Sequence, residues 1–312
     1  DLKVFGVHFD NWFSEQTLHD ADAIQHTIDA LAARGFVYES DSARWFGSTV
    51  FGDEKDRVVI RSNGVSTYFA ADLAYHRDKF KRGFDTVIDI WGADHHGYME
   101  RMLAGVQALG RKRDDLRIIL VQLVNLLRAG KPVAMSTRAG EFVTLREVID
   151  EVGTDAARFI FLTRRSDSQL DFDLDVAKSQ SNDNPVYYVQ YAHARLCSVF
   201  EVAKERGIEY HRPDGNNLSF LKSLVLPEEL AIIKLLGEYP HVLAKCATAL
   251  EPHIIPYYLH ELVSIFHSYY NHNRILGEDP ELTQARLAMA DAIRIVIHNA
   301  MDLLGVSAPE KM

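Results

Sequence analysis

The sequence changes character near Ser179, and this change restricts the possible folds more than any other feature. Before Ser179, short runs rich in β-branched and aromatic residues alternate with helical stretches, as in open sheets covered by helices. After Ser179, strand-like runs stop and only long helical periodicities remain, at residues 183–207, 227–250, 256–277 and 281–305. The sequence therefore predicts an α/β part followed by an all-α part, an antiparallel helical bundle.

The α/β part contains alternating strand and helix patterns. Residues 71–83 and 97–110 have helical periodicity and end at glycines, residues 86–93 between them have the composition of a buried strand, and residues 116–127 form another apolar run. A strand–helix–strand series of this kind predicts parallel pairing with right-handed crossovers.

Local signals predict three further features. The Asn63-Gly64 dipeptide joins two alternating runs and predicts a β-hairpin. Thr144 and Glu147 have the spacing of a capping box, which predicts a helix start at that point. Pro240 lies inside a long helical pattern and predicts a break there.

Composition excludes some classes of protein. The formal net charge of −10 over 312 residues argues against an unspecific nucleic-acid coat but leaves room for a local basic site. No apolar run reaches the roughly 18 residues of a membrane span, which predicts a soluble protein. Cys197 and Cys246 are too few for a disulfide framework, and they indicate a reducing, cytosolic setting.

Two constellations in the α/β part could carry chemistry. Tyr68, Asp72 and His76 follow one another at intervals of four, so they share one face of a helix and could receive a cationic ligand; the alternative is an ordinary surface face. His95 and His96 follow a predicted strand, where ligands bind in doubly wound sheets, and they suggest a nucleotide contact or, less readily, a metal. The alternative is a strand end with solvated imidazoles.

A third constellation surrounds the loop from Gly130 to Gly140. Lys131 and Arg138, together with exposed backbone N–H groups, would suit a polyphosphate. Because basic turns are common, an ordinary surface hairpin is the alternative interpretation.

Seven segments, taken in chain order, resemble the second part of bacterial arginyl-tRNA synthetases. They are FGVHFDNWFSE, TYFAADLAYH, IWGADHHGY, AMSTRAGEFVTL, DAARF, DFDLDVAKSQSNDNPVYYVQYAHARLCSV and NAMDLLGVSAPEKM. The resemblance implies a class I enzyme that activates arginine with ATP and Mg²⁺ and transfers it to tRNA(Arg). It also implies a cytoplasmic monomer with no membrane association, no zinc and no tightly bound cofactor.

The resemblance implies three regions. Residues 1–128 correspond to a partial Rossmann-type catalytic domain, residues 129–178 to the ATP loop with its connecting helices, and residues 179–312 to a helical anticodon-binding domain.

Residues matching the arginine site of the family are Glu15, Tyr68, Asp72 and His96. A guanidinium group carries five donors in a planar fork and pairs well with carboxylates, so the acidic residues suit this role. Residues matching the ATP site are Asp94, His95, Lys131, Met135, Ser136 and Arg138. Ala134 and Thr137 stand where the family loop usually has lysines, so Arg138 and Lys131 are the expected substitutes.

The resemblance also places an RNA site on the helical part. Unpaired bases stack on aromatic rings and bond to polar side chains, which the residues of two helices here could supply; a packed core is the alternative for aromatic residues at helical spacing. The expected anticodon contacts are Tyr188, Tyr191, Arg195, Tyr269, Asn271, Arg274 and Met312.

The sequence lacks the His-x-Gly-His string of class I enzymes and the N-terminal domain of the family. We therefore expect the C-terminal portion of a longer enzyme, which cannot form arginyl-adenylate alone. Two other interpretations stay open. One is a non-enzymatic tRNA-binding module; the other is a metal-dependent hydrolase that uses Asp72, His76 and Asp94. Cysteinyl and methionyl relatives fit less well, because they usually carry zinc.

Overall fold

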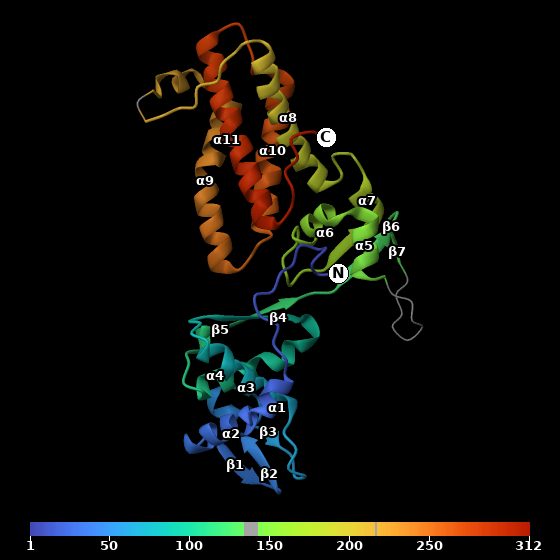
Figure 1. Cartoon of the computed structure of the whole chain (residues 1–312), viewed down its shortest axis with the longest axis vertical. Coiled ribbons are helices and arrows are strands. Elements are labelled where there is room, and N and C mark those ends of the chain that lie inside the picture. The colour runs from blue at the N-terminus through green and yellow to red at the C-terminus, as the bar shows by residue number, and fades with distance from the viewer. Residues whose placement is uncertain (134–142, 216) are drawn as a thin grey trace. The chain divides into compact units, whose positions relative to one another are not determined.

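The computed structural model describes residues 1–133, 143–215 and 217–312. The chain forms two compact units: residues 9–123, here called the α/β unit, and residues 1–8 with 124–312, here called the helical unit. Strands and short helices make up the first unit, whereas long helices dominate the second (Figure 1). The predicted order, α/β followed by all-α, is confirmed.

The α/β unit contains two small sheets. One is antiparallel with the order β1-β2-β3, and the other is the parallel pair β4-β5. The strands are β1 (Val37–Ser40), β2 (Ala43–Phe46), β3 (Arg57–Ile60), β4 (Val87–Gly92) and β5 (Leu116–Val121). The α-helices are α1 (Gln16–Asp20), α2 (Ala23–Ala33), α3 (Tyr68–Lys81) and α4 (Met99–Ala108), and the 3₁₀ turn η2 (Ala93–Tyr98) follows β4.

Strand β4 differs from the fully buried strand that its composition predicts. Val87 and Asp89 are buried, whereas Ile88 is 44% and Ile90 68% exposed. Successive side chains of a strand point to opposite faces, so only one face of β4 is covered within the described residues. Asp89, the charged residue of β4, therefore lies on the covered, inner face of the strand.

The hairpin predicted at Asn63-Gly64 is reduced to a tight turn. Gly64 has a φ of 78°, and a single antiparallel bridge joins Ile60 to Ser66. The second run does not continue as a strand, because Thr67 caps α3 by accepting a hydrogen bond from the backbone N–H of Ala70 at 3.3 Å. A favourable N-cap thus starts the helix where alternation alone predicted a strand.

The helical unit begins with a small sheet of order β7-β6-β8, in which β6 and β8 are parallel. Thr144 and Glu147 form the predicted capping box at the start of α5. The elements are β6 (Val124–Arg128), β7 (Lys131–Pro132), β8 (Leu170–Asp173), α5 (Leu145–Val152), α6 (Thr154–Phe161) and α7 (Leu174–Lys178).

Four long helices form the bundle of the helical unit, as the periodicities predict (Figure 1). They are α8 (Pro185–Glu205), α9 (Pro227–Ala249), α10 (Ile254–His272) and α11 (Pro280–Leu304). The break predicted at Pro240 is wrong, because α9 continues through it. Pro240 is exposed, so solvent can satisfy the carbonyl group that loses its N–H partner.

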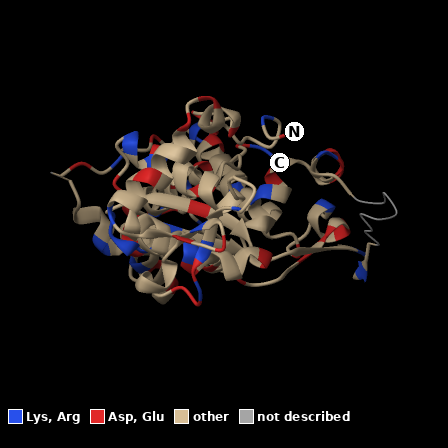
Figure 2. Ribbon diagram, turned by 90° about the horizontal axis from the view of Figure 1, so that it is seen from below, with Lys and Arg blue, Asp and Glu red and all other residues tan. Residues whose placement is uncertain are grey.

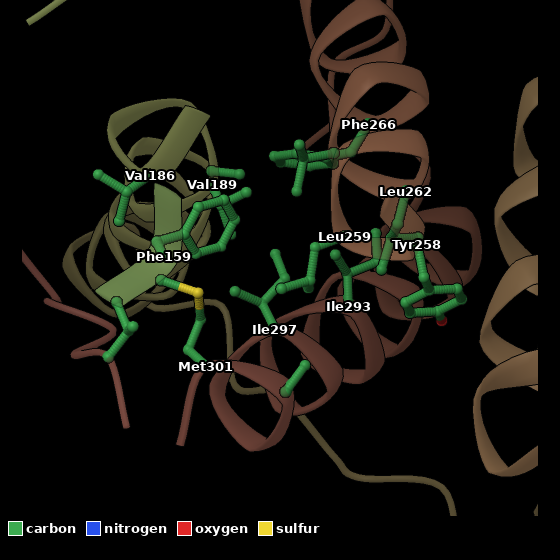
Figure 3. Packing of buried hydrophobic residues seen from close by; sticks show 14 of the residues in the cluster. Phe159, Val186, Val189, Tyr258, Leu259, Leu262, Phe266, Ile293, Ile297 and Met301 are labelled. Carbon is green, nitrogen blue, oxygen red and sulfur yellow. The ribbon is translucent and has the colours of Figure 1, made fainter. Parts of the chain in front are cut away.

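The core of the helical unit joins α6 to the bundle. Phe159 of α6, Val189 of α8, Leu262 of α10 and Ile297 of α11 are at most 1% exposed and belong to one cluster (Figure 3). Burial of such side chains contributes about 1.5–3 kcal/mol each. The connecting helices are therefore fixed to the bundle by one continuous apolar core.

Arg158 ties three distant segments of the helical unit together. It donates to the backbone carbonyl of Phe5 at 2.8 Å and to that of Leu304 at 3.0 and 3.1 Å. Gly305 follows with a φ of 65°, and a β-carbon there would collide with the Arg158 guanidinium. Glycine is thus required both by the backbone conformation and by the close approach.

Charged residues of both signs are interspersed along the described ribbon (Figure 2). None of the helices in the described ranges is both long and apolar enough to cross a membrane.

Candidate functional site

A cleft of about 560 Å³ opens between α3, β4 and η2 of the α/β unit. The lining residues are Tyr68, Asp72, Tyr75, His76, Lys79, Asp89, Ile90, Trp91, Gly92, His95 and Tyr98.

Asp89 lies at the bottom of this cleft and bonds to two cationic side chains of α3. One carboxylate oxygen accepts from Nε2 of His76 and the other from Nζ of Lys79, each at 2.7 Å. The other ring nitrogen of His76, Nδ1, lies 2.8 Å from the backbone carbonyl of Asp72. Because both partners of the ring are acceptors, both nitrogens donate and His76 is the imidazolium.

The pKa of Asp89 is lowered by this arrangement. Burial by itself raises the pKa, but the hydrogen bonds and charges of His76 and Lys79 outweigh it. Asp89 is therefore a carboxylate whose charge is already balanced within the protein.

Asp72 has a different environment. Its Oδ2 accepts a hydrogen bond from the Tyr98 hydroxyl at 2.6 Å, and within the described residues no cation bonds to its side chain. Burial raises the pKa of Asp72, while the Tyr98 bond and the charge of His76 oppose the rise. The pKa of Tyr98 is also raised, first by burial and then by Asp72, so Tyr98 is the donor.

The two carboxylates of the cleft thus differ in what they can bind. Asp89 is occupied by two cations, and Asp72 is bonded only to a neutral phenol on its side chain. A partly buried carboxylate without a cation costs free energy that a cationic ligand can recover. The geometry therefore suits a ligand with a positively charged, hydrogen-bond-donating group.

The other residues predicted for this region lie around the cleft or beside it. Tyr68 is 81% exposed at its rim and also lines a second cleft, of about 240 Å³, together with Glu15. His95 lines the first cleft. Asp94 and His96 are exposed and belong to neither lining.

The basic loop is described only at its start. Ala129 and Gly130 both have positive φ, as a two-residue type I′ hairpin turn between β6 and β7 requires, and Lys131 is exposed. The N–H of Gly130 donates to Asp173 at 2.7 Å, so this group is already used within the protein. The predicted residues Met135, Ser136 and Arg138 lie outside the described residues.

In the helical unit, Arg195 of α8 lies between two tyrosine rings. Its guanidinium carbon is 4.6 Å from the ring centroids of both Tyr191 and Tyr270. It donates to the Tyr191 hydroxyl at 2.9 Å and to Nδ1 of His267 at 3.1 Å. These contacts hold the guanidinium in one place, and among the described residues it pairs with no carboxylate.

The geometry also assigns the protonation of His267. Nδ1 accepts from Arg195, while Nε2 lies 3.2 Å from the backbone carbonyl of Tyr188 and must donate. The ring is therefore neutral. Burial lowers the pKa of His267, in agreement with this assignment.

Aromatic rings extend this surface along α8. Tyr187 and Tyr191 stack with centroids 6.0 Å apart, and Tyr188 lies 4.6 Å from His267. Tyr191 is 36% exposed, so part of its side chain is accessible to solvent. We call Tyr187, Tyr188, Tyr191, Arg195 and Tyr270 the aromatic surface.

Tyr269 lies apart from the aromatic surface. It is 1% exposed, and its hydroxyl donates to the buried Glu229 at 2.8 Å. Its ring therefore packs inside the bundle, contrary to an expected contact with a base. Asn271 is exposed on α10, Arg274 lines a cleft of about 530 Å³ with Tyr270, and Met312 is 55% exposed.

Reasoning from sequence missed Asp89, Lys79 and Tyr98 as site residues. Asp89 could have been noticed, because it is the single acid in an otherwise apolar strand. The bond between Tyr98 and Asp72 joins residues 26 positions apart and has no local pattern.

Within the described ranges, no group of three His, Cys, Asp or Glu side chains is placed to hold a metal ion. Asp72, His76 and Asp94, which the hydrolase interpretation requires, do not converge, because His76 is turned toward Asp89.

Two protein families match the chain. Residues 9–185 match the family "tRNA synthetases class I (R), catalytic domain", and residues 189–312 match the "DALR anticodon binding domain". These two ranges together cover nearly all of the sequence in the predicted order.

Individual relatives agree with the family matches. The chain is 60% identical over its whole length to an arginine–tRNA ligase of Citrifermentans bemidjiense and 61% identical to one of Geobacter sp., and it spans 56% of each. The chain therefore spans about half the length of these curated relatives. The arginyl-tRNA synthetase structure of Thermus thermophilus has a similar fold, with a TM-score of 0.80 at 21% identity, covering 100% of this chain and 62% of that one.

The Asp89 network makes a testable contribution to stability. Asp89→Asn leaves the buried His76 and the partly buried Lys79 without their carboxylate, so we expect a loss of about 3 kcal/mol in the unfolding free energy near neutral pH. Because the folded pKa of Asp89 is lowered, its contribution is complete above the pKa of an unfolded aspartate, about 3.9, and disappears as the pH falls through the folded value. Chemical denaturation between pH 3 and 7 measures both effects.

Asp78→Asn is the matched control on the same helix. Asp78 pairs with Arg82 at 3.3 Å, and both side chains are about one-third exposed, so its loss should change stability by less than about 1 kcal/mol. Equal losses for the two variants would contradict a special role for Asp89.

Proposed function

Because the chain belongs to the arginyl family of class I aminoacyl-tRNA synthetases, we propose that the Asp72 cleft binds the guanidinium group of arginine. The observation that carries this proposal is the unequal pairing of the two carboxylates in the cleft. Asp89 is balanced by His76 and Lys79, which leaves Asp72 as the partner for a cation from outside.

A guanidinium suits this cleft better than a simple ammonium. Asp72 offers one carboxylate oxygen beyond the one bonded to Tyr98, and the neighbouring cleft contributes Glu15. The planar fork of a guanidinium can reach both acids with separate N–H groups. Tyr68 lines both clefts, so its phenol ring can cover the bound side chain. Glu15 and Tyr68 are therefore included in the proposed arginine site, together with His96, which is exposed on η2 beside the cleft.

Asp72→Asn should weaken arginine binding by roughly 10- to 100-fold, because a charged hydrogen bond contributes about 1.5–3 kcal/mol. Isothermal titration of the chain with arginine measures the change. Asp78→Asn, which removes a carboxylate from the outer part of the same helix, should leave the dissociation constant unchanged. The same loss in both variants would indicate general charge attraction and would contradict the assignment of Asp72.

The whole protein is proposed to be an arginine–tRNA ligase that uses ATP with Mg²⁺. The loop that begins at the β6–β7 turn is the proposed phosphate-binding segment. Lys131 is exposed at its start and can supply a positive charge. Charge that develops on a departing pyrophosphate would be stabilised by such a cation. The proposed ATP site also includes Met135, Ser136 and Arg138 of this loop. Asp94 and His95 belong to the same site and are proposed to lie near the adenosine.

The chain alone is proposed not to activate arginine, because its sequence has no His-x-Gly-His string to hold ATP. Arginine-dependent exchange between ATP and pyrophosphate should be absent for this chain, with the full-length Citrifermentans bemidjiense relative as the positive control. Exchange at the rate of that relative would contradict the proposal.

The helical unit is proposed to bind the anticodon of tRNA(Arg) through the aromatic surface. Tyr191 offers an exposed ring on which a base can stack, and Arg195 adds a positive charge that no described carboxylate neutralises. Stacking and a fixed cation are the interactions that single-stranded RNA uses most. Asn271, Arg274 and Met312 are solvent-accessible candidates for further contacts, whereas the buried Tyr269 supports the helix from inside.

Because these residues all belong to the helical unit, binding of RNA need not depend on catalysis. A tRNA-binding module is therefore the second proposed function for the chain by itself.

Arg195→Ala should weaken binding of a tRNA(Arg) transcript by about tenfold, since a stacked base and its cation contribute about 1–3 kcal/mol. Lys234→Ala removes an exposed charge from α9 of the same unit and should have a much smaller effect. Both variants are titrated with the natural transcript and with one that carries a changed middle anticodon base. An equal response to the two transcripts in the unsubstituted chain would contradict anticodon binding.

A further inference from the structure

Tyr98 is the only described residue whose side chain bonds to the carboxylate of Asp72. It ends η2, and its hydroxyl donates to Oδ2 of Asp72 at 2.6 Å across the cleft. The second carboxylate oxygen has no partner among the described residues. A hydrogen bond this short to a carboxylate limits its rotation.

We propose that Tyr98 is a positioning residue for arginine: its hydroxyl holds the Asp72 carboxylate with one oxygen occupied and the other directed to the ligand. This inference rests on the proposed arginine site. It goes beyond that site by assigning a further residue, Tyr98 of η2, which acts through Asp72 and need not touch arginine.

The ring of Tyr98 is itself held firmly. It meets Phe69 and Trp91 edge to face, with centroid distances of 6.1 and 5.9 Å, and the Arg101 guanidinium lies 4.7 Å from its centroid. These contacts come from α3, β4 and α4, so three elements fix the phenol before any ligand arrives. A preorganised donor of this kind reduces the entropy lost on binding.

The charges around Asp72 explain why a donor is needed. Burial favours the protonated acid, and the nearby carboxylates Glu15 and Asp89 act in the same direction; Tyr98 is the largest opposing influence, followed by His76. The titratable groups that face Asp72 are Tyr98 of η2, His76 of α3, Asp89 of β4 and Glu15 at the start of α1; Lys79 and His95 line the same cleft.

Without the Tyr98 hydroxyl, two things should change at once. The carboxylate of Asp72 gains rotational freedom, which weakens arginine binding at every pH. The pKa of Asp72 also rises further, so the carboxylate is lost at a higher pH as the solution is acidified. Loss of a side chain with only a structural role would weaken arginine binding but would not shift the pKa of Asp72.

The test is Tyr98→Phe in the complete chain, which keeps the ring and removes only the hydroxyl. At pH 8 the arginine dissociation constant should rise roughly tenfold, the size expected for a hydrogen bond to a charged group. On titration from pH 8 to pH 5, the variant should lose arginine affinity at a higher pH than the unsubstituted chain. Both are measured by calorimetry, with the melting temperature recorded to confirm folding.

Tyr38→Phe is the matched control. Tyr38 also donates its hydroxyl to an aspartate, Asp56, at 2.8 Å in the same unit, but neither residue lines the cleft. This variant loses the same kind of bond and should keep both the affinity and the pH profile of the unsubstituted chain.

A second readout needs no ligand. Carbon-detected NMR of the Asp72 carboxyl group follows its titration directly, and Tyr98→Phe should move that titration to higher pH. If the unsubstituted chain does not bind arginine, the proposed function is wrong for this chain, while the Asp72 titration still decides the role of Tyr98. An unchanged Asp72 titration, or equal arginine affinity and pH profile in the two chains, would overturn the inference.

Discussion

The ion pairs that Asp89 makes with His76 and Lys79 determine the chemistry of the cleft in the α/β unit. They place two cations of α3 against the inner face of β4, where both bond to one carboxylate. Had His76 or Lys79 turned to Asp72 instead, that acid would already be neutralised. Because the strand supplies its own acid for the helix, Asp72 keeps its charge for a ligand. The ion pairs of the fold and the proposed ligand binding thus involve different carboxylates, Asp89 of β4 and Asp72 of α3.

Local chemistry explains why some elements could be predicted from sequence. The capping box of Thr144 and Glu147 and the glycines that end helices act within a few residues, so their consequences are visible in a short window. Pro240 shows the limit of this reasoning. The local pattern predicts a break there, but α9 continues because Pro240 lies on an exposed face of the helix. Asp89 shows a second limit. Its burial depends on which face of β4 the helices cover, and no local pattern contains that information.

Neighbouring tyrosines of α10 illustrate the same limit in the helical unit. Tyr269 and Tyr270 are adjacent in sequence, yet the first is buried against Glu229 and the second lies over Arg195. Successive residues of a helix differ by about 100° in direction, so a shift of one residue exchanges core and surface. Resemblance to a family motif points to this stretch of α10, but it does not show which of the two tyrosines lies on the surface. The packing of α10 against α8 and α9 decides between them.

The two units also show why net charge predicts neither site. The chain carries −10 overall, but the α/β unit presents a carboxylate suited to a cation, and the helical unit presents a guanidinium suited to an anionic nucleic acid. Among the described residues, the side chains that bond to or stack on each group are neutral: a phenol bonds to Asp72, and a neutral imidazole with two phenol rings contacts Arg195. Neutral partners orient a charge without cancelling it. An acidic chain can therefore hold one site for a cation and another for RNA, provided that each charge is positioned by uncharged groups.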